Sequence, residues 1–332
     1  MTTYLLTGAA GFIGSHLAQA LMSRGANVVG VDDFNDFYDP RLKRRNVAPF
    51  LKMEAFRLEE GDIRSLPFLR EAFRRERFDA VLHLAARAGV RPSLKDPLLY
   101  EETNVRGTLN LLECAREFSV KKFLFASSSS VYGNRKEVPF REDMNVDFPI
   151  SPYAATKKAG ELLCYNTHHL YGMDVTCLRY FTVYGPAQRP EMAIRKFTQA
   201  LLRGRSIVLY GDGSSERDYT YVDDAVHGTL QALEHLDGFH IYNIGESRTI
   251  SLKGLAALIE SAVGTKAKIE WQPHQPGDVE RTYADISLAR REIGYDPKTS
   301  IEEGVERTVA WCRAEGGPAG AEAATLTGSD KL

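Results

Sequence analysis

A tyrosine and a lysine, Tyr153 and Lys157, form the most reactive pair of side chains that the sequence offers. In the helix predicted from Tyr153 to Tyr171, residues with this spacing lie one turn apart on the same face. A free tyrosine hydroxyl has a pKa of about 10 and is a poor base at neutral pH. A nearby ammonium group favours the phenolate and lowers that pKa. The pair therefore indicates a general base that acts on a hydroxyl group, and a solvated helix face is the ordinary alternative.

A serine cluster, Ser127 to Ser130, precedes this helix in the chain. It follows the apolar run from Lys122 to Ala126, which predicts a buried strand. A serine hydroxyl at the end of such a strand can hold a substrate hydroxyl and share its proton. Because ligands of doubly wound sheets bind beyond the carboxyl ends of the strands, we expect the serine and the tyrosine to face the same cleft.

A glycine-rich loop, Thr7 to Gly14, follows the predicted strand Tyr4 to Leu6, and apolar residues recur after it at helical spacing. One glycine makes a tight turn, one lets the backbone approach a phosphate, and one lets the helix pack closely on the strand. The helix N-terminus then faces the anion. The loop predicts a dinucleotide site, and a glycine turn in another α/β protein is the alternative.

An acidic residue, Asp32, ends the next apolar run, Val28 to Val31. It lies about 20 residues beyond the glycines, where an acid can hydrogen-bond the adenine ribose of a dinucleotide. A carboxylate at this position repels a 2′-phosphate. The sequence therefore favours NAD over NADP.

Strands and helices alternate through the first half of the chain, which predicts an α/β fold with a doubly wound, Rossmann-type parallel sheet. The predicted strands include Phe56–Leu58, Asp79–Ala85, Lys122–Ala126 and Val175–Tyr180, and the predicted helices include Leu98–Phe118 and Tyr153–Tyr171. After Gly185 the alternation loosens, and helices are expected near Met192–Leu202, Asp223–His235, Leu252–Val263 and Glu302–Cys312. These elements predict a smaller α/β domain that closes over the ends of the sheet.

The composition excludes several classes of partner and site. The 42 Lys and Arg residues and 44 Asp and Glu residues give a net charge of -2, so we expect neither a nucleic-acid nor a membrane partner. No apolar stretch approaches the ~20 residues of a membrane span, and the N-terminal strand leaves no room for a signal peptide. The four scattered cysteines indicate a reduced, cytoplasmic protein. No cluster has metal-ligand spacing, so no metal site is expected.

These motifs resemble those of the extended short-chain dehydrogenase/reductases that act on nucleotide sugars, the NAD-dependent epimerase/dehydratase family. The resemblance covers residues 2 to about 313 and is carried by TGAAGFIG at 7–14, GDI at 61–63, HLAA at 83–86, SSSSVYG at 127–133, YAATK at 153–157 and RDYTYVDD at 217–224. It implies that Tyr153 is the general base, that Lys157 is its activator and a ribose ligand, and that Ser128 is the catalytic serine.

The resemblance also implies the remaining site residues. For NAD these are Gly8, Gly11, Phe12, Ile13, Gly14, Asp32, Asp62, Ile63, Leu84, Ala85, Ala86, Asn104, Tyr153, Lys157 and Tyr180. Arg217 and Arg281 look like contacts of the UDP group, because a planar guanidinium binds phosphate oxygens bidentately. For either arginine alone, a surface ion pair is the alternative.

The implied domains are an NAD-binding domain over 1–180, with 217–245 crossing back to it, and a nucleotide-sugar-binding domain over 181–216 and 246–315. Residues 316–332 are rich in Gly, Ala and Thr without an apolar period, which predicts a disordered tail. By resemblance, the helices at Leu98–Phe118 and Tyr153–Tyr171 pair two copies into a homodimer.

The reaction type is predicted from the residues that stand where related enzymes have catalytic acids. Dehydratases of the family carry Asp-Glu before the Val-Tyr-Gly motif and decarboxylases carry a Glu, whereas this chain has Ser129 and Ser130. An enzyme that has only the tyrosine, lysine and serine can oxidise a carbinol and return the hydride to the other face. The resemblance therefore implies epimerisation of a UDP-sugar.

Three stretches resemble those of UDP-glucuronate 4-epimerases: Asp33–Asp39 with Leu42–Arg45, Ala88–Ser93, and Tyr180–Pro186. Thr182 stands where galactose-type epimerases usually have asparagine, and Arg189 where glucuronate epimerases hold the C5 carboxylate. A buried carboxylate requires a cation or several donors, which Arg189, Thr182, Ser129 and Ser130 can supply together.

Two other functions stay open from the sequence. The first is 4-epimerisation of a neutral UDP-sugar, UDP-glucose or UDP-N-acetylglucosamine, for which Arg189 would be an exposed loop residue. The second is a nucleotide-binding sensor that kept the fold and lost catalysis. Such proteins typically lose the tyrosine or the lysine, and this chain keeps both Tyr153 and Lys157.

Overall fold

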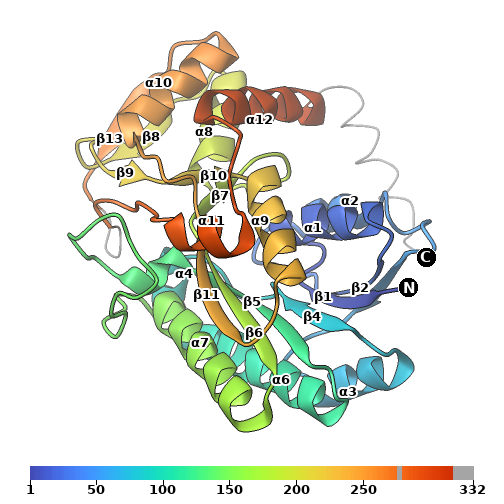
Figure 1. Cartoon of the computed structure of the whole chain (residues 1–332). Helices are drawn as coiled ribbons and strands as arrows, with labels where there is room; N and C mark the ends of the chain where they lie inside the picture. Colours follow the sequence, from blue (N-terminus) through green and yellow to red (C-terminus); the bar gives the residue numbers. More distant parts are fainter. Residues whose placement is uncertain (275–278, 317–332) are drawn as a thin grey trace.

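The computed structural model describes residues 1–274 and 279–316, and its centre is a seven-stranded sheet (Figure 1). All neighbouring strands in this sheet pair in parallel, in the order β11-β6-β5-β4-β1-β2-β3. The strands are β1 (Thr3–Thr7), β2 (Asn27–Asp32), β3 (Phe56–Glu60), β4 (Ala80–His83), β5 (Lys122–Ser128), β6 (Asp174–Tyr180) and β11 (Phe239–Ile244). The predicted doubly wound parallel sheet is confirmed.

Helices cover both faces of the sheet (Figure 1). On one face α1 (Phe12–Ser23) packs against α2 (Pro40–Val47) and α9 (Val222–Glu234). On the other face α6 (Gly107–Glu117) packs against α3 (Leu66–Arg75) and α7 (Pro152–Tyr171). Alternate strand residues therefore enter two separate apolar cores: Leu6, Val28, Leu82 and Leu124 on the first face, and Leu5, Val29, Val81 and Phe123 on the second. Burial of both faces explains the continuous apolar runs of these strands.

A second group of elements lies beyond the carboxyl ends of the strands. Here α8 (Ala193–Leu202), α10 (Leu252–Val263) and α12 (Ile301–Gly316) pack on one another (Figure 1). They are joined by three two-stranded sheets: β7 (Thr182–Tyr184) with β10 (Tyr219–Tyr221), β8 (Ile207–Tyr210) with β13 (Ile269–Gln272), and β9 (Glu216–Arg217) with β12 (Ile250–Ser251). The short helix α11 (Ser287–Ile293) packs near β11 and α9.

The stretch expected to be one helix from Leu98 to Phe118 is divided in the structure. After α4 (Val90–Lys95), the chain forms α5 (Pro97–Glu101), a π-helical segment η1 (Glu102–Arg106) and then α6. The sequence of η1 contains no Pro or Gly that would mark a break, so the sequence predicts one uninterrupted helix. A wider turn of this kind often marks a functional region of a helix.

Other expectations concern the ends and surfaces of the chain. Gly316 is the last residue of α12, and the rest of the expected disordered tail, 317–332, lies outside the described residues. Across 1–274 and 279–316, no helix combines the length and apolarity that crossing a membrane would require. The same residues contain no group of three or more His, Cys, Asp or Glu side chains placed to hold a metal ion.

A buried ion pair joins the elements that carry the serine cluster and the tyrosine helix. Glu161 of α7 and Arg179 of β6 pair through two contacts of 2.8 and 2.9 Å, with both side chains 1% exposed. Ser127 donates its hydroxyl to the same carboxylate at 2.6 Å, and Arg179 donates to the Tyr132 hydroxyl at 3.0 Å. The pair therefore fixes the end of β5 relative to α7.

We predict that Glu161→Gln destabilises the fold, because it leaves the Arg179 cation buried without its counter-charge. The expected loss in the free energy of unfolding is about 3–5 kcal/mol, measured by urea denaturation. The control is Glu113→Gln, which breaks the exposed pair of Glu113 with Arg116 and should cost less than about 1 kcal/mol. Equal losses in the two variants would contradict the importance given to the buried pair.

Candidate functional site

A cavity of about 780 Å³ lies at the carboxyl ends of the parallel strands, between the sheet and the second group of elements. The loops after β1, β2, β3, β4 and β5 form one wall. The opposite wall comes from the segment that runs from the end of β6 into α8, with Arg217 and Tyr219. The site therefore lies where doubly wound sheets bind their ligands.

The glycine loop between β1 and α1 has no room for side chains at two of its three glycines. Gly8 has a φ of +73°, and a Cβ there would lie 2.8 Å from the backbone nitrogen of Ala85. A Cβ on Gly14 would lie 2.0 Å from the carbonyl oxygen of Gly8. The close approach leaves the N-terminus of α1, which begins at Phe12, facing the cavity. Such a helix start favours an anion.

Asp32 lines the same end of the cavity and is buried. Its carboxylate accepts from the backbone nitrogens of Ala10 and Phe34 at 3.1 and 3.0 Å, which fixes its orientation. The buried ammonium of Lys43 lies 3.8 Å from it, in α2. Burial raises the pKa of Asp32, and Lys43 opposes that rise. An oriented carboxylate of this kind suits a ribose diol.

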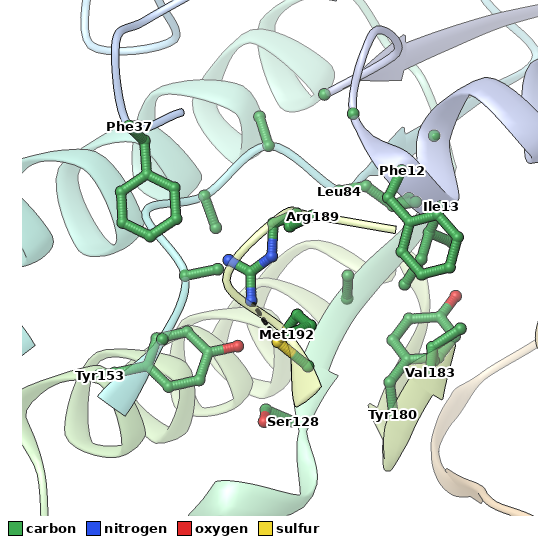
Figure 2. Close-up of a pocket in the computed structure, with 18 of the residues that line it drawn as sticks. Phe12, Ile13, Phe37, Leu84, Ser128, Tyr153, Tyr180, Val183, Arg189 and Met192 are labelled. Carbon is green, nitrogen blue, oxygen red and sulfur yellow. Dashed lines mark hydrogen bonds between the residues drawn. The ribbon is translucent and has the colours of Figure 1, made fainter. Parts of the chain in front are cut away.

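Tyr153, Ser128 and Arg189 point into one space at the other end of the cavity (Figure 2). Burial raises the pKa of Tyr153, while the neighbouring Ser128 hydroxyl and the charge of Arg189 lower it. The Ser128 hydroxyl also accepts from the Ser130 hydroxyl at 2.9 Å and from the Ser130 backbone nitrogen at 3.2 Å. Two hydroxyls and one cation therefore converge where a reacting carbinol would lie.

Lys157 is buried beneath this group, and its ammonium donates to the carbonyl of Ala126 at 2.7 Å. Burial lowers the pKa of Lys157 to about 8. The sequence predicts that Lys157 lowers the pKa of Tyr153. In the structure, Ser128 and Arg189 act on that pKa in the same direction. The effect of Lys157 itself stays a prediction.

Arg189 occupies the middle of the cavity between Phe37 and Met192 (Figure 2). Its guanidinium lies 5.5 Å from the centre of the Phe37 ring, and one nitrogen donates to the Met192 sulfur at 3.4 Å. Its Nε pairs with Glu191 at 3.2 Å. The Nη1 atom is buried and has no hydrogen-bond partner among the described residues. A buried donor without an acceptor is costly, so this atom is suited to a ligand oxygen.

Most of the residues expected from the sequence line this cavity. They are Gly8, Gly11, Phe12, Ile13, Gly14, Asp32, Asp62, Ile63, Leu84, Ala85, Ala86, Ser128, Ser129, Ser130, Tyr153, Lys157, Tyr180, Thr182, Arg189 and Arg217. The structure thus brings together residues from both halves of the chain.

Two expected residues are not among the described residues that line it. Asn104 is buried behind the wall, where its amide bonds both backbone groups of Arg87, at 2.8 and 3.0 Å, and the Thr156 hydroxyl. Arg281 is half-exposed and pairs with Glu216 at 2.6 Å. Asn104 therefore stabilises the loop after β4. Arg281 forms a surface ion pair, which was the alternative to a contact with the UDP group.

The sequence reasoning left out several lining residues. Phe37 and Tyr38 come from the insert after Asp32, Lys43 comes from α2, and Val90 and Arg91 come from the start of α4. The sequence signal for these residues is that 33–39 with 42–45, and 88–93, resemble stretches of a known enzyme family. Neither motif shows by itself which of its side chains turn inward.

Comparison with known proteins places the chain in a family. The family model described as GDP-mannose 4,6 dehydratase matches residues 5–308, and the chain belongs to this family, within the extended short-chain dehydrogenase/reductases. It is 46% identical to a UDP-glucuronate 4-epimerase of Thermodesulfobacterium geofontis over 94% of this chain and 97% of that protein. The family expected from the motifs is confirmed.

Solved structures agree with this assignment. A Bacillus cereus UDP-glucuronic acid 4-epimerase in complex with UDP-glucuronic acid and NAD has a TM-score of 0.89 and 36% identity, and covers 94% of this chain and 99% of that one. A Thermotoga maritima UDP-glucose 4-epimerase with UDP-glucose has a TM-score of 0.87 and 34% identity, with the same coverage. The fold is therefore shared with epimerases of both acidic and neutral sugars.

We predict that Gly14→Ala destabilises the protein by about 1–3 kcal/mol or more, because the new Cβ meets the backbone of Gly8, which cannot move freely. The control is Gly254→Ala in α10, where the nearest atoms belong to side chains and alanine favours the helix. Thermal unfolding of both variants measures the difference. Similar melting temperatures for the two variants would show that the loop tolerates the side chain.

Proposed function

We infer that this chain catalyses the NAD-dependent C4 epimerisation of UDP-glucuronate to UDP-galacturonate, through a 4-keto intermediate. The single observation that carries the substrate is Arg189, a cation in the middle of the cavity whose buried Nη1 has no partner among the described residues. Tyr153 and Ser128 lie beside it and can act on a neighbouring hydroxyl. The relatives named above support the same reaction.

The first end of the cavity fits NAD. Side chains are excluded at Gly8 and Gly14, so the backbone at the start of α1 can approach a diphosphate. Asp32 accepts the adenine ribose hydroxyls and disfavours a 2′-phosphate. The proposed lining is completed by Gly11, Phe12, Ile13, Asp62, Ile63, Leu84, Ala85, Ala86 and Tyr180. NAD, when bound, supplies the acceptor and then the donor of the C4 hydride.

Tyr153 takes the proton of the C4 hydroxyl as the carbinol becomes a ketone, and returns it when the carbinol is restored. Ser128 holds the same oxygen by a hydrogen bond and shares its proton. Lys157 stays charged below pH about 8 and stabilises the phenolate through the field of its buried ammonium. Because the 4-keto sugar must present both faces, it rotates within the cavity between the two steps.

The carboxylate of the sugar is held by Arg189, Thr182 and the hydroxyls of Ser129 and Ser130, which all line the cavity. The arginine supplies the charge that a buried carboxylate requires. A 4-keto uronate is a β-keto acid and loses carbon dioxide readily. These contacts must therefore also hold the carboxylate in an orientation in which decarboxylation is slow. No acid stands at Ser129 or Ser130 to expel a hydroxyl.

We assign residues 1–180 and 217–245 to the NAD-binding domain, and 181–216 and 246–315 to the domain that binds the nucleotide sugar. Pairing of β11 with β6 supports the return of the chain to the first domain. Arg217, the first residue of the stretch that returns to the NAD-binding domain, lines the cavity and binds the UDP diphosphate. Arg281 joins it only if it leaves Glu216, to which it is paired in this structure.

We also propose a homodimer and a cytoplasmic location. The two helices that the family pairs, α6 and α7, expose the apolar side chains Leu109, Leu162, Tyr165, Leu170 and Tyr171, which a second copy would cover. The four cysteines are free and buried, as in a reducing compartment.

Proton NMR of the purified protein with UDP-glucuronate tests the function. We expect an anomeric signal of UDP-galacturonate that grows to a stable equilibrium, with NAD added if the protein is isolated without it. Conversion of UDP-glucose or UDP-N-acetylglucosamine, with none of UDP-glucuronate, would instead assign a neutral sugar. UDP-pentose is the product of decarboxylation. A substantial amount of it from the wild-type protein would contradict the proposed binding of the carboxylate.

The pKa of Lys157 predicts the pH dependence. Above pH about 8 the lysine loses its proton and no longer supports the phenolate, so kcat/KM for UDP-glucuronate should fall. Lys157→Arg keeps the charge at higher pH and should move this fall upward, at a lower overall rate. If the fall stays near pH 8 in the arginine variant, Lys157 is not the group that titrates.

A further inference from the structure

The end of α12 places a carboxylate, Glu315, against both domains. Its side chain is 13% exposed and accepts two hydrogen bonds from Arg195 of α8, at 2.8 and 3.0 Å. It also pairs with Arg45 of α2. The helices α8 and α2 lie in different parts of the fold (Figure 1). Through its two arginine partners, Glu315 therefore links these two parts.

Arg195 bonds Glu315 and also Gln188, the residue directly before Arg189. Its side chain is 4% exposed, and its Nη1 donates to the carbonyl oxygen of Gln188. The backbone nitrogen of Arg195 donates to the Gln188 side chain at 3.3 Å, and that side chain donates to the Val183 carbonyl at 3.0 Å. Gln188 is therefore held on three sides, directly before Arg189 in the chain.

The guanidinium of Arg195 needs Glu315 to stay in this place. It is buried against the Trp311 ring, at 4.9 Å from the ring centre, and a buried cation requires an anion nearby. Glu315 is the anionic partner that the structure gives it. Removal of that charge favours movement of Arg195 toward solvent, which would release Gln188.

The second partner of Glu315, Arg45, lies on α2, the helix whose Lys43 lines the cofactor end of the cavity. Arg45 lies two residues after Lys43, whose buried ammonium faces Asp32. Phe37, from the insert that precedes α2, forms the apolar face against which Arg189 lies (Figure 2). The same carboxylate is thus linked, through one arginine each, to the loop of Arg189 and to α2, the helix that follows the insert.

We propose that Glu315 and Arg195 are positioning residues for the sugar carboxylate: through Gln188 they hold Arg189 in the middle of the cavity. The proposal rests on the proposed function, since it assumes that Arg189 binds a uronate. It assigns a role in substrate choice to the last turn of α12, 126 residues beyond Arg189. Neither residue touches the substrate in this account.

The test is Glu315→Gln in the protein loaded with NAD, which removes the charge and keeps the size. Three quantities are measured: KM for UDP-glucuronate, the inhibition constant of UDP, and the share of turnover that ends as UDP-pentose. We expect KM to rise at least about tenfold, because small displacements of a positioning group have large kinetic effects. The pentose share should rise as well, while UDP, which has no carboxylate, should bind as in the wild type.

Two variants control the experiment. Glu306→Gln removes an exposed carboxylate of the same helix and should change none of the three quantities. Glu315→Asp keeps the charge and should restore KM in part. If Glu315→Gln fails to fold, Arg195→Lys gives the same test, because lysine keeps the charge but cannot bond Glu315 and Gln188 together.

The outcomes separate this proposal from the proposed function. If the wild type converts UDP-glucuronate and Glu315→Gln matches Glu306→Gln, the positioning role is wrong and the function stands. If UDP and UDP-glucuronate weaken equally, Glu315 is merely structural and the proposal also fails. If the wild type does not convert UDP-glucuronate at all, the proposed function itself is overturned.

Discussion

A guanidinium held inside a cavity with apolar walls is the interaction on which the rest of this site depends. Arg189 is 20% exposed, lies against Phe37, and keeps one buried nitrogen without a partner among the described residues. Holding a cation in this position has a free-energy cost that a bound carboxylate offsets. The arginine therefore favours an acidic sugar, and its charge also lowers the pKa of Tyr153. Substrate choice and base strength are thus coupled through one side chain.

The parallel sheet explains how distant residues meet at this point. Each strand ends at the same edge, so the glycine loop, Asp32, the serine cluster and Tyr180 come to one cavity although they lie far apart in the sequence. The buried pair of Glu161 and Arg179 then fixes α7 against the ends of β5 and β6. Ser128 and Tyr153 are consequently carried by packed elements of the sheet and its helices, whereas Thr182 and Arg189 come from the segment that leads into α8.

Periodicity and motif spacing predicted six of the seven strands of the sheet, most of the longer helices and most of the cavity lining, because apolar runs and glycine loops are local features. The helices α2, α3, α4 and α11 were not predicted. Long-range contacts were not predictable in the same way. Asn104, which is expected near the cofactor, bonds both backbone groups of Arg87, a contact that no motif indicates. The hydrogen bond of Lys157 to the Ala126 carbonyl at the end of β5 is a contact of this kind, between residues 31 positions apart. No sequence motif predicts the pairing of Glu315 with Arg195, because the two residues lie 120 positions apart.

The most direct test of the central claim is the affinity of the NAD-loaded protein for UDP-glucuronate and for UDP-glucose, measured by calorimetry in the wild type and in Arg189→Gln. The account predicts that the wild type binds the uronate more tightly. It further predicts that the substitution removes this preference and leaves the affinity for UDP-glucose nearly unchanged, because only the carboxylate uses the arginine. An undiminished preference for UDP-glucuronate in Arg189→Gln would contradict the account.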